Sequence, residues 1–302
     1  MPDIVLSIPP YIHNKNSTTQ MMQWVLWATL PALIAYTLFF GFGTLLHVMI
    51  CITSALLFEA GCLKIQKKPI LCSLKDYSAC VTAVLLAFTL SPFAPLWLGI
   101  VGTFCAIVVA KHGYGGLGQN LFNPAMVGAV VLLVFFPENW MFSPEKQIFA
   151  PEKIANNFPL IGNHLYEITS IAWILGGLLL LYKKVIGWVI PCAMLSSLGL
   201  SASLGYLWGL SPETPLFHLF FNTTLLGAFF IATDPVTSTT GTQGKWIYGV
   251  LLGVLLYIIR LLHSVPEALP FAILIANAMV PTIDALTRPI YCSPFESQGG
   301  GK

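Results

Sequence analysis

Charged side chains are scarce in this sequence, and their scarcity is its most informative feature. Asp, Glu, Lys and Arg make up only 9% of its 302 residues, whereas soluble domains contain about 25%. The net charge of +2 comes from scattered residues, and nucleic-acid-binding proteins instead gather Lys and Arg on one surface. The composition therefore excludes a soluble globular domain and favours no nucleic-acid partner.

Residue patterns of side-chain catalysis and metal binding are lacking too. No Ser/His/Asp, Cys/His or paired-carboxylate arrangement can be identified, so no catalytic residue is predicted. The seven cysteines form no C-x-x-C pair and mostly lie in apolar runs. That placement is typical of small buried side chains and not of a four-thiolate iron–sulfur or zinc site. No metal site is predicted.

Long apolar runs are abundant. Hydrophobic residues make up 56% of the chain, and runs near 20 residues match a hydrocarbon core of about 30 Å at 1.5 Å per helical residue. The first run has no small-residue cleavage site behind it, so we expect a retained helix there. We predict an all-α integral membrane protein with about ten transmembrane helices, at 21–41, 43–63, 78–92, 95–111, 124–136, 168–183, 185–208, 216–233, 247–262 and 268–286.

The longest connection, 137–167, divides these helices into five plus five. Of two similar segments, Phe122–Val127 opens the fifth predicted helix and Ala276–Val280 lies in the tenth. A duplication of five helices would place the halves in inverted orientation, as in many transporters, although chance similarity of apolar sequence is the alternative. The predicted organisation is a cytoplasmic segment 1–20, a first half 21–136, an external loop 137–167, a second half 168–286 and a cytoplasmic tail 287–302.

The distribution of Lys and Arg predicts the orientation. With the N-terminus in the cytoplasm, eleven of the fourteen Lys and Arg residues fall on the inner side and three on the outer side. Because cytoplasmic loops carry an excess of these residues, both termini are expected in the cytoplasm.

A glycine-rich segment, Lys111–Pro124, precedes the fifth predicted helix. Its glycines allow tight turns and a close approach of the backbone to a ligand, and a glycine loop before a helix can hold phosphate. It lacks the G-K-[ST] of a P-loop, so a tight re-entrant turn explains it equally well. Its candidate cofactor-binding residues are Gly115, Gly116, Gly118, Asn120 and Asn123.

A hydroxyl-rich segment, Thr233–Thr242, is the second polar feature. Six Ser and Thr side chains surround Asp234 there. Such groups either cap helix ends or bind a polar ligand, and both interpretations stay open. Asp234, Thr237 and Ser238 complete the candidate cofactor-binding residues.

Few ionisable side chains lie within the predicted helices. Glu59 is placed about one turn from the end of its helix, where Lys64 is the expected ion-pair partner. His47 and His218 lie on apolar helices and are expected to be buried, hydrogen-bonded histidines and not ligands.

Taken together, these segments resemble a known family. Ser7–Asn14, Leu74–Ala79, Tyr114–Met126, Leu226–Thr237 and Ile275–Asp284 follow one another in that family's order. The chain resembles the D subunits of Rnf ion-translocating electron transport complexes, which are similar to the B subunit of the sodium-translocating NADH:quinone reductase.

The resemblance implies a location, partners and a cofactor. It implies ten helices in the bacterial inner membrane, the partner subunits A, B, C, E and G, and electron transfer between ferredoxin and NAD coupled to ion transport. The implied cofactor is a flavin, FMN or riboflavin or both. A solute channel or transporter, and a scaffold subunit without cofactor, are the alternative functions.

This sequence departs from the family in the segment that would carry covalently bound FMN. The resemblance implies an FMN phosphate esterified to a threonine, in a motif of the S-G-A-T type, in the external loop. Residues 137–167 contain no threonine, and their only serine is Ser143. We therefore predict that this chain carries no covalent flavin, whereas a non-covalent flavin remains open.

Overall fold

The computed structural model describes residues 18–116, 118–138, 164–220, 222–263 and 267–287, and these are helical apart from turns and short connections. The first group of elements is α1 (Thr18–Phe40), α2 (Gly43–Ile65), α3 (Ile70–Leu74), α4 (Ser78–Thr89), α5 (Trp97–Phe104), the π-helix η1 (Cys105–His112) and α6 (Pro124–Phe135). The second group is α10 (His164–Tyr182), α11 (Val189–Leu207), α12 (Pro215–Phe220), α13 (Asn222–Leu226), the π-helix η2 (Gly227–Ile231), α14 (Thr242–His263) and α15 (Ala268–Thr287).

The prediction of an all-helical membrane protein is confirmed. Five helices, α1, α2, α11, α14 and α15, are long and apolar enough to cross a membrane, and four more apolar helices are shorter. The expected single helix 216–233 is not observed as one regular helix, because the described residues there form α12, α13 and the π-helix η2, which ends at Ile231. The Thr224 hydroxyl and the Arg260 guanidinium each donate to the carbonyl of His218 near the end of α12, both at 2.9 Å.

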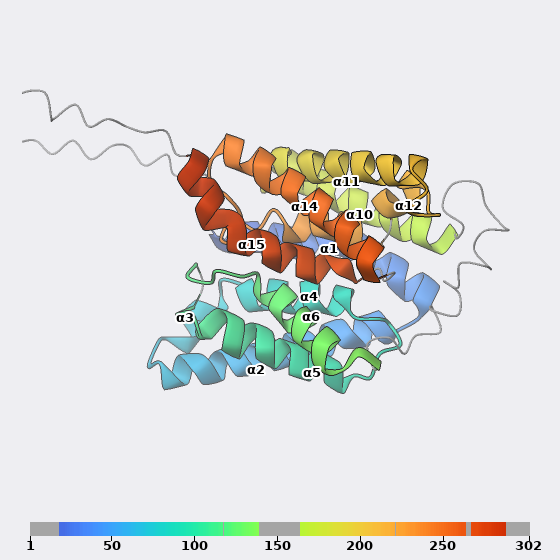
Figure 1. Cartoon of the computed structure of the whole chain (residues 1–302). Helices are drawn as coiled ribbons and strands as arrows, with labels where there is room; N and C mark the ends of the chain where they lie inside the picture. Colours follow the sequence, from blue (N-terminus) through green and yellow to red (C-terminus); the bar gives the residue numbers. More distant parts are fainter. Residues whose placement is uncertain (1–17, 117, 139–163, 221, 264–266, 288–302) are drawn as a thin grey trace, which may run out of the picture.

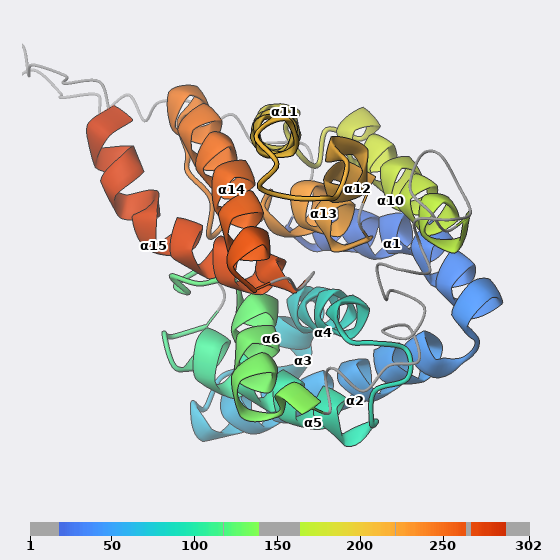
Figure 2. The same cartoon turned by 45° about the vertical axis from the view of Figure 1, so that its right-hand side comes forward.

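The helices form two groups that are visible in both views (Figures 1 and 2). Elements α2 to α6 lie together, α10 to α15 lie together, and α1 lies with α10 in the second group. Within the groups, α2 packs against α4 and α5, and α14 packs against α11 and α15. Contacts of α1 with α10 and of α6 with α15 join the first five helices of the chain to the last five.

Small residues and aromatic rings pack around α10, within the second group and across to the first. A Cβ on Gly176 of α10 would lie 2.2 Å from the carbonyl oxygen of Ala28 in α1, so glycine permits this close helix contact. The fully buried Trp173 ring meets Phe88 of α4 edge-on at 4.7 Å and Phe230 of η2 at 5.1 Å. These aromatic contacts connect elements far apart in sequence at the centre of the molecule.

The outside of the bundle is apolar. Leu38, Leu57, Ile65, Leu207 and Leu286 are each at least 73% exposed. Soluble monomers rarely expose apolar surface on this scale, whereas lipid tails cover it without cost. The exposed side chains therefore support the membrane location.

Candidate functional site

A pocket with a mainly apolar lining and a few polar side chains lies between the two groups of helices. It encloses about 90 Å³ and is lined by the beginnings of α1, α4 and α6, the end of η1, residues of η2 and the segment that follows it. Its polar lining residues are Ser78, Thr82, Lys111, Asn120, Asn123, Thr233 and Asp234. Three predicted site residues, Asn120, Asn123 and Asp234, thus meet at one place although more than 100 positions separate Asn123 from Asp234.

Asn123 holds one wall of this pocket. Its side-chain oxygen accepts the backbone N–H of Met126 at 3.3 Å and so caps the start of α6. Its side-chain amide lies 3.5 Å from an Asp234 oxygen, and its backbone N–H donates to the Asn277 side chain at 3.2 Å. The Asn277 amide in turn donates to the Thr237 carbonyl and the Tyr248 hydroxyl. The asparagines of the two similar sequence segments are therefore in direct contact.

Asp234 organises the turn that follows η2. One carboxylate oxygen accepts the backbone N–H of Val236 at 3.2 Å, and the other accepts the Thr237 hydroxyl at 3.0 Å. Burial raises the pKa of the Asp234 carboxyl above its usual range, although both hydrogen bonds oppose this. Thr237 and Ser238 are buried behind the pocket wall. Because α14 begins only at Thr242, Asp234 shapes its own turn and does not cap that helix.

The glycine-rich segment reverses the chain tightly after η1. Gly115, Gly116 and Gly118 have φ values of +111°, +110° and +84°, a region that side chains with a Cβ rarely adopt. The Gly116 N–H donates back to the Lys111 carbonyl at 3.0 Å. None of the three glycines lines the pocket. Their backbone serves the turn that brings Asn120 and Asn123 to it.

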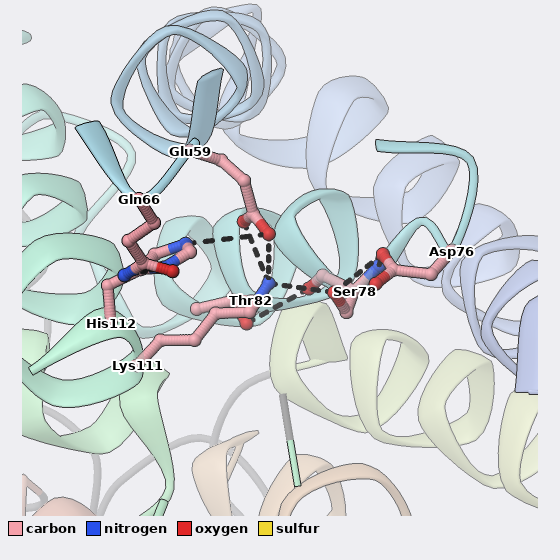
Figure 3. Close-up of polar contacts among 7 residues, drawn as sticks. All are labelled: Glu59, Gln66, Asp76, Ser78, Thr82, Lys111 and His112. Carbon is pink, nitrogen blue, oxygen red and sulfur yellow. Dashed lines mark hydrogen bonds and ion pairs between the residues drawn. The ribbon is translucent and has the colours of Figure 1, made fainter. Parts of the chain in front are cut away.

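A buried ion pair borders the pocket, and its partners differ from the expected ones (Figure 3). Lys111, 2% exposed, donates to both oxygens of Glu59 at 2.7 Å and to the Ser78 hydroxyl at 2.8 Å. The expectation that Lys64 pairs with Glu59 is wrong, because it lies five positions along the same helix, and side chains with that spacing point to different faces. The nitrogen of Lys111 has thus all three of its donors satisfied.

The two expected buried histidines differ in their contacts. His47 Nε2 lies 3.0 Å from the Ala94 carbonyl, which confirms a hydrogen-bonded core histidine. Both ring nitrogens of His218 are buried without a hydrogen-bond partner among the described residues, 3.7 Å from Glu213 at the nearest. The expectation of a hydrogen-bonded ring is therefore wrong for His218.

The aromatic and hydroxyl lining of the pocket was not predicted from the sequence. Phe229 and Phe230 belong to η2, and Ser78 begins α4. Two π-helical segments, which often occur at functional sites, thus flank the pocket, with η1 contributing Lys111. An uninterrupted apolar run gives no sign of such a change in helical pitch.

The lining offers both hydrogen-bonding groups and apolar surface to a ligand. Amides, hydroxyls, one carboxyl group and one fixed ammonium group face a space with two phenylalanine rings. Within the described ranges, no group of three His, Cys, Asp or Glu side chains is placed to hold a metal ion. Most of the predicted external loop 137–167 and of the terminal segments 1–20 and 287–302 lies outside the described residues.

Comparisons with known proteins agree with this architecture. The model of the NQR2, RnfD, RnfE family matches residues 5–292. A protein of Aeromonas salmonicida, named as the D subunit of the ion-translocating oxidoreductase complex, is 40% identical over 337 positions, covering 93% of this chain and 96% of the relative. Proteins of the same name from Aliivibrio salmonicida and Yersinia pseudotuberculosis are 41% and 38% identical, each over 93% of this chain and 95% of the relative.

The alignments also reveal missing length inside this chain. The 337 aligned positions cover 93% of 302 residues, which is about 281 residues. About 56 positions of the alignment, the difference between 337 and 281, are therefore gaps in this chain. The relative carries residues there that this chain lacks.

Proposed function

Since this chain belongs to the NQR2, RnfD, RnfE family and is a D subunit of the ion-translocating oxidoreductase type, we propose that it holds a non-covalent flavin between its two groups of helices. The flavin would pass electrons within the complex, and the protein would position it and tune its electronics. The observation that carries the proposal is the pocket that Asn120, Asn123, Asp234, Lys111 and two phenylalanines share.

The residues of the pocket fit the chemistry of a flavin. Asn120, Asn123 and Asp234 offer donors and acceptors for the polar edge of the isoalloxazine ring, and Phe229 and Phe230 offer apolar faces. The enclosed volume of about 90 Å³ is smaller than the roughly 300–1,000 Å³ of small-molecule sites. Entry of the ring therefore requires the walls of the pocket to separate.

The arrangement of the chain supports two inverted halves. Seven successive elements run from α1 to α6 and seven from α10 to α15, with a short helix at the third position in each, α3 and α12. Elements at equal positions touch, α1 with α10 and α6 with α15, and so do Asn123 and Asn277. Contacts between equivalent elements are what a two-fold axis in the membrane plane produces, and binding sites of inverted-repeat proteins lie at that interface.

A location and partners follow from the same interpretation. The chain is a multi-pass membrane protein and one subunit of a multi-subunit oxidoreductase. The finer proposal is the bacterial inner membrane, with the A, B, C, E and G subunits as neighbours and lipid around the exposed apolar side chains. The names of the relatives favour this role over a solute channel or transporter.

The proposed topology places both termini in the cytoplasm and residues 137–167 outside. Its basis is the excess of Lys and Arg on one side. Reporter fusions at Gly300 and Asn157 are expected to give opposite signals, the first cytoplasmic and the second external. Equal signals at the two positions would contradict ten membrane crossings.

Replacing Asp234 by asparagine tests the site itself. Asparagine retains an acceptor for the turn, so stability should fall by no more than about 1 kcal/mol. The charge-assisted contacts to the cofactor are lost, each worth about 1.5–3 kcal/mol, so flavin affinity and electron transfer by the purified complex should fall at least about tenfold.

The matched control is Glu213→Gln, which removes an acid that does not line the pocket and is 45% exposed. This variant should retain flavin and electron transfer. Full flavin content and electron transfer in Asp234→Asn would remove Asp234 from the site and leave it a role in the turn alone.

A further inference from the structure

A series of polar side chains runs from Gln66 to Ser78, with one gap wider than a hydrogen bond, between His112 and Glu59 (Figure 3). The exposed Gln66 side chain, one residue beyond α2, lies 3.3 Å from Nδ1 of His112. On the other side of that ring, Nε2 lies 3.7 Å from a Glu59 oxygen. Glu59 accepts from Lys111 at 2.7 Å, and Lys111 donates to Ser78 at 2.8 Å. Lys111 and Ser78 line the pocket, whereas Glu59 and His112 do not.

From this geometry we infer that His112, Glu59 and Lys111 form a proton relay between the bundle end next to Gln66 and the pocket. The inference rests on the proposed function, because a redox cofactor that takes up electrons in a closed apolar bundle also needs protons. An ion pair that only stabilised the fold would need Glu59 and Lys111 but not His112. Here a titratable imidazole, 5% exposed, lies between the pair and the exposed Gln66, and the ammonium group lies at the pocket.

Each transfer breaks and forms one N–H or O–H bond, and no oxidant or reductant is needed. Lys111 releases a proton from Nζ into the pocket and becomes a neutral amine. The amine then takes a proton that Glu59 received from His112, and His112, 5% exposed, is reprotonated by water that displaces the Gln66 amide from Nδ1. Between these steps the buried Glu59 carboxylate lacks its ammonium partner, a costly state that draws the next proton inward.

The distances allow this sequence of transfers. The distances from Lys111 Nζ to the Glu59 and Ser78 oxygens are already those of hydrogen bonds. The His112 ring and the Glu59 carboxylate would have to approach each other by less than about 1 Å to form a hydrogen bond. Other ionisable groups near the relay are Lys68 beside His112, and Cys62, Cys80 and Asp76 beside Glu59 and Ser78. Asp76 accepts from the N–H and hydroxyl of Ser78 and fixes the hydroxyl that faces Lys111.

The test is proton uptake by the purified complex on rapid reduction, followed with a pH-indicator dye alongside flavin content. Glu59→Gln keeps the shape of the side chain and removes its ability to carry a proton. It should slow proton uptake at least about tenfold, within the range that positioned proton donors contribute. Flavin content should stay at the wild-type level, because Glu59 does not line the pocket.

A second variant covers the case in which Glu59→Gln does not assemble. His112→Gln leaves the Glu59–Lys111 pair intact and should slow proton uptake to a similar degree. Added imidazole should restore the rate, a rescue that a merely structural role for His112 would not show. The control Lys68→Met removes a neighbouring charge outside the relay, and its uptake rate should stay within about twofold of wild type.

The outcomes separate the relay from the flavin site. Normal proton uptake in His112→Gln, or slow uptake that imidazole does not restore, overturns the relay while the flavin site stands. Slow uptake with full flavin content and imidazole rescue supports both. If the wild-type complex holds no flavin, both the flavin site and the relay are overturned, because the relay then has no group to protonate.

Discussion

Replacing Lys111 by methionine should cost about 3–5 kcal/mol of stability, the usual effect of leaving one partner of a buried ion pair without the other. The Glu59 carboxylate, 3% exposed, would lose its ammonium partner in a position from which water is largely excluded. Methionine fills most of the space of the lysine stem, so the loss would reflect charge and not a cavity. Titration of the variant with SDS in mixed micelles, read as the free energy of unfolding, measures it.

The double variant Glu59→Gln/Lys111→Met distinguishes charge from packing. It removes both charges, so it should recover most of the stability that Lys111→Met loses. Lys75→Met, at a position outside the ion pair and the pocket, is the matched control and should change stability by less than about 0.5 kcal/mol. A double variant that is less stable than Lys111→Met would show that the pair does not hold α2, α4 and η1 together by its charges.

Local features of the sequence predicted the helices well, because each apolar run of membrane length has little choice of conformation. The predicted helix 43–63 is observed as Gly43–Ile65, and 268–286 as Ala268–Thr287. The change to the π-helix η2 inside the predicted helix 216–233 was not predicted, because a change of helical pitch leaves no mark on the apolar pattern of a run.

Contacts between segments that are distant in the chain could not be predicted from the sequence. Asn123, Asp234 and the second asparagine, Asn277, were separate features of the sequence, and their meeting at one place depends on the packing of α6 against α15. The partner of Glu59 was expected nearby at Lys64, whereas the structure supplies Lys111 from 52 positions away. Three positive φ values explain why glycines occupy the turn before Asn120, since that requirement is local.

The second large effect concerns how the flavin is held. A phosphoester link of the kind that the family resemblance implies needs a threonine hydroxyl that a transferase can approach. Residues 137–167 contain none, and the alignment with a relative leaves about 56 positions without a counterpart in this chain. Thr169, the nearest threonine, is fully buried in α10, so its hydroxyl is out of reach. We therefore expect this protein to carry no covalently bound flavin, in contrast to what the family resemblance implies.

The central claim is that this protein holds its flavin without a covalent bond, in the pocket formed by Asn123, Asp234 and their neighbours. The direct measurement is to express the complex together with its flavin transferase, denature it, and view the gel for flavin fluorescence. We expect no fluorescent band at 32.9 kDa, with flavin released into the supernatant and less released from Asp234→Asn. A fluorescent band at that mass, lost in Ser143→Ala or Thr169→Val, would contradict the claim and identify the attachment residue.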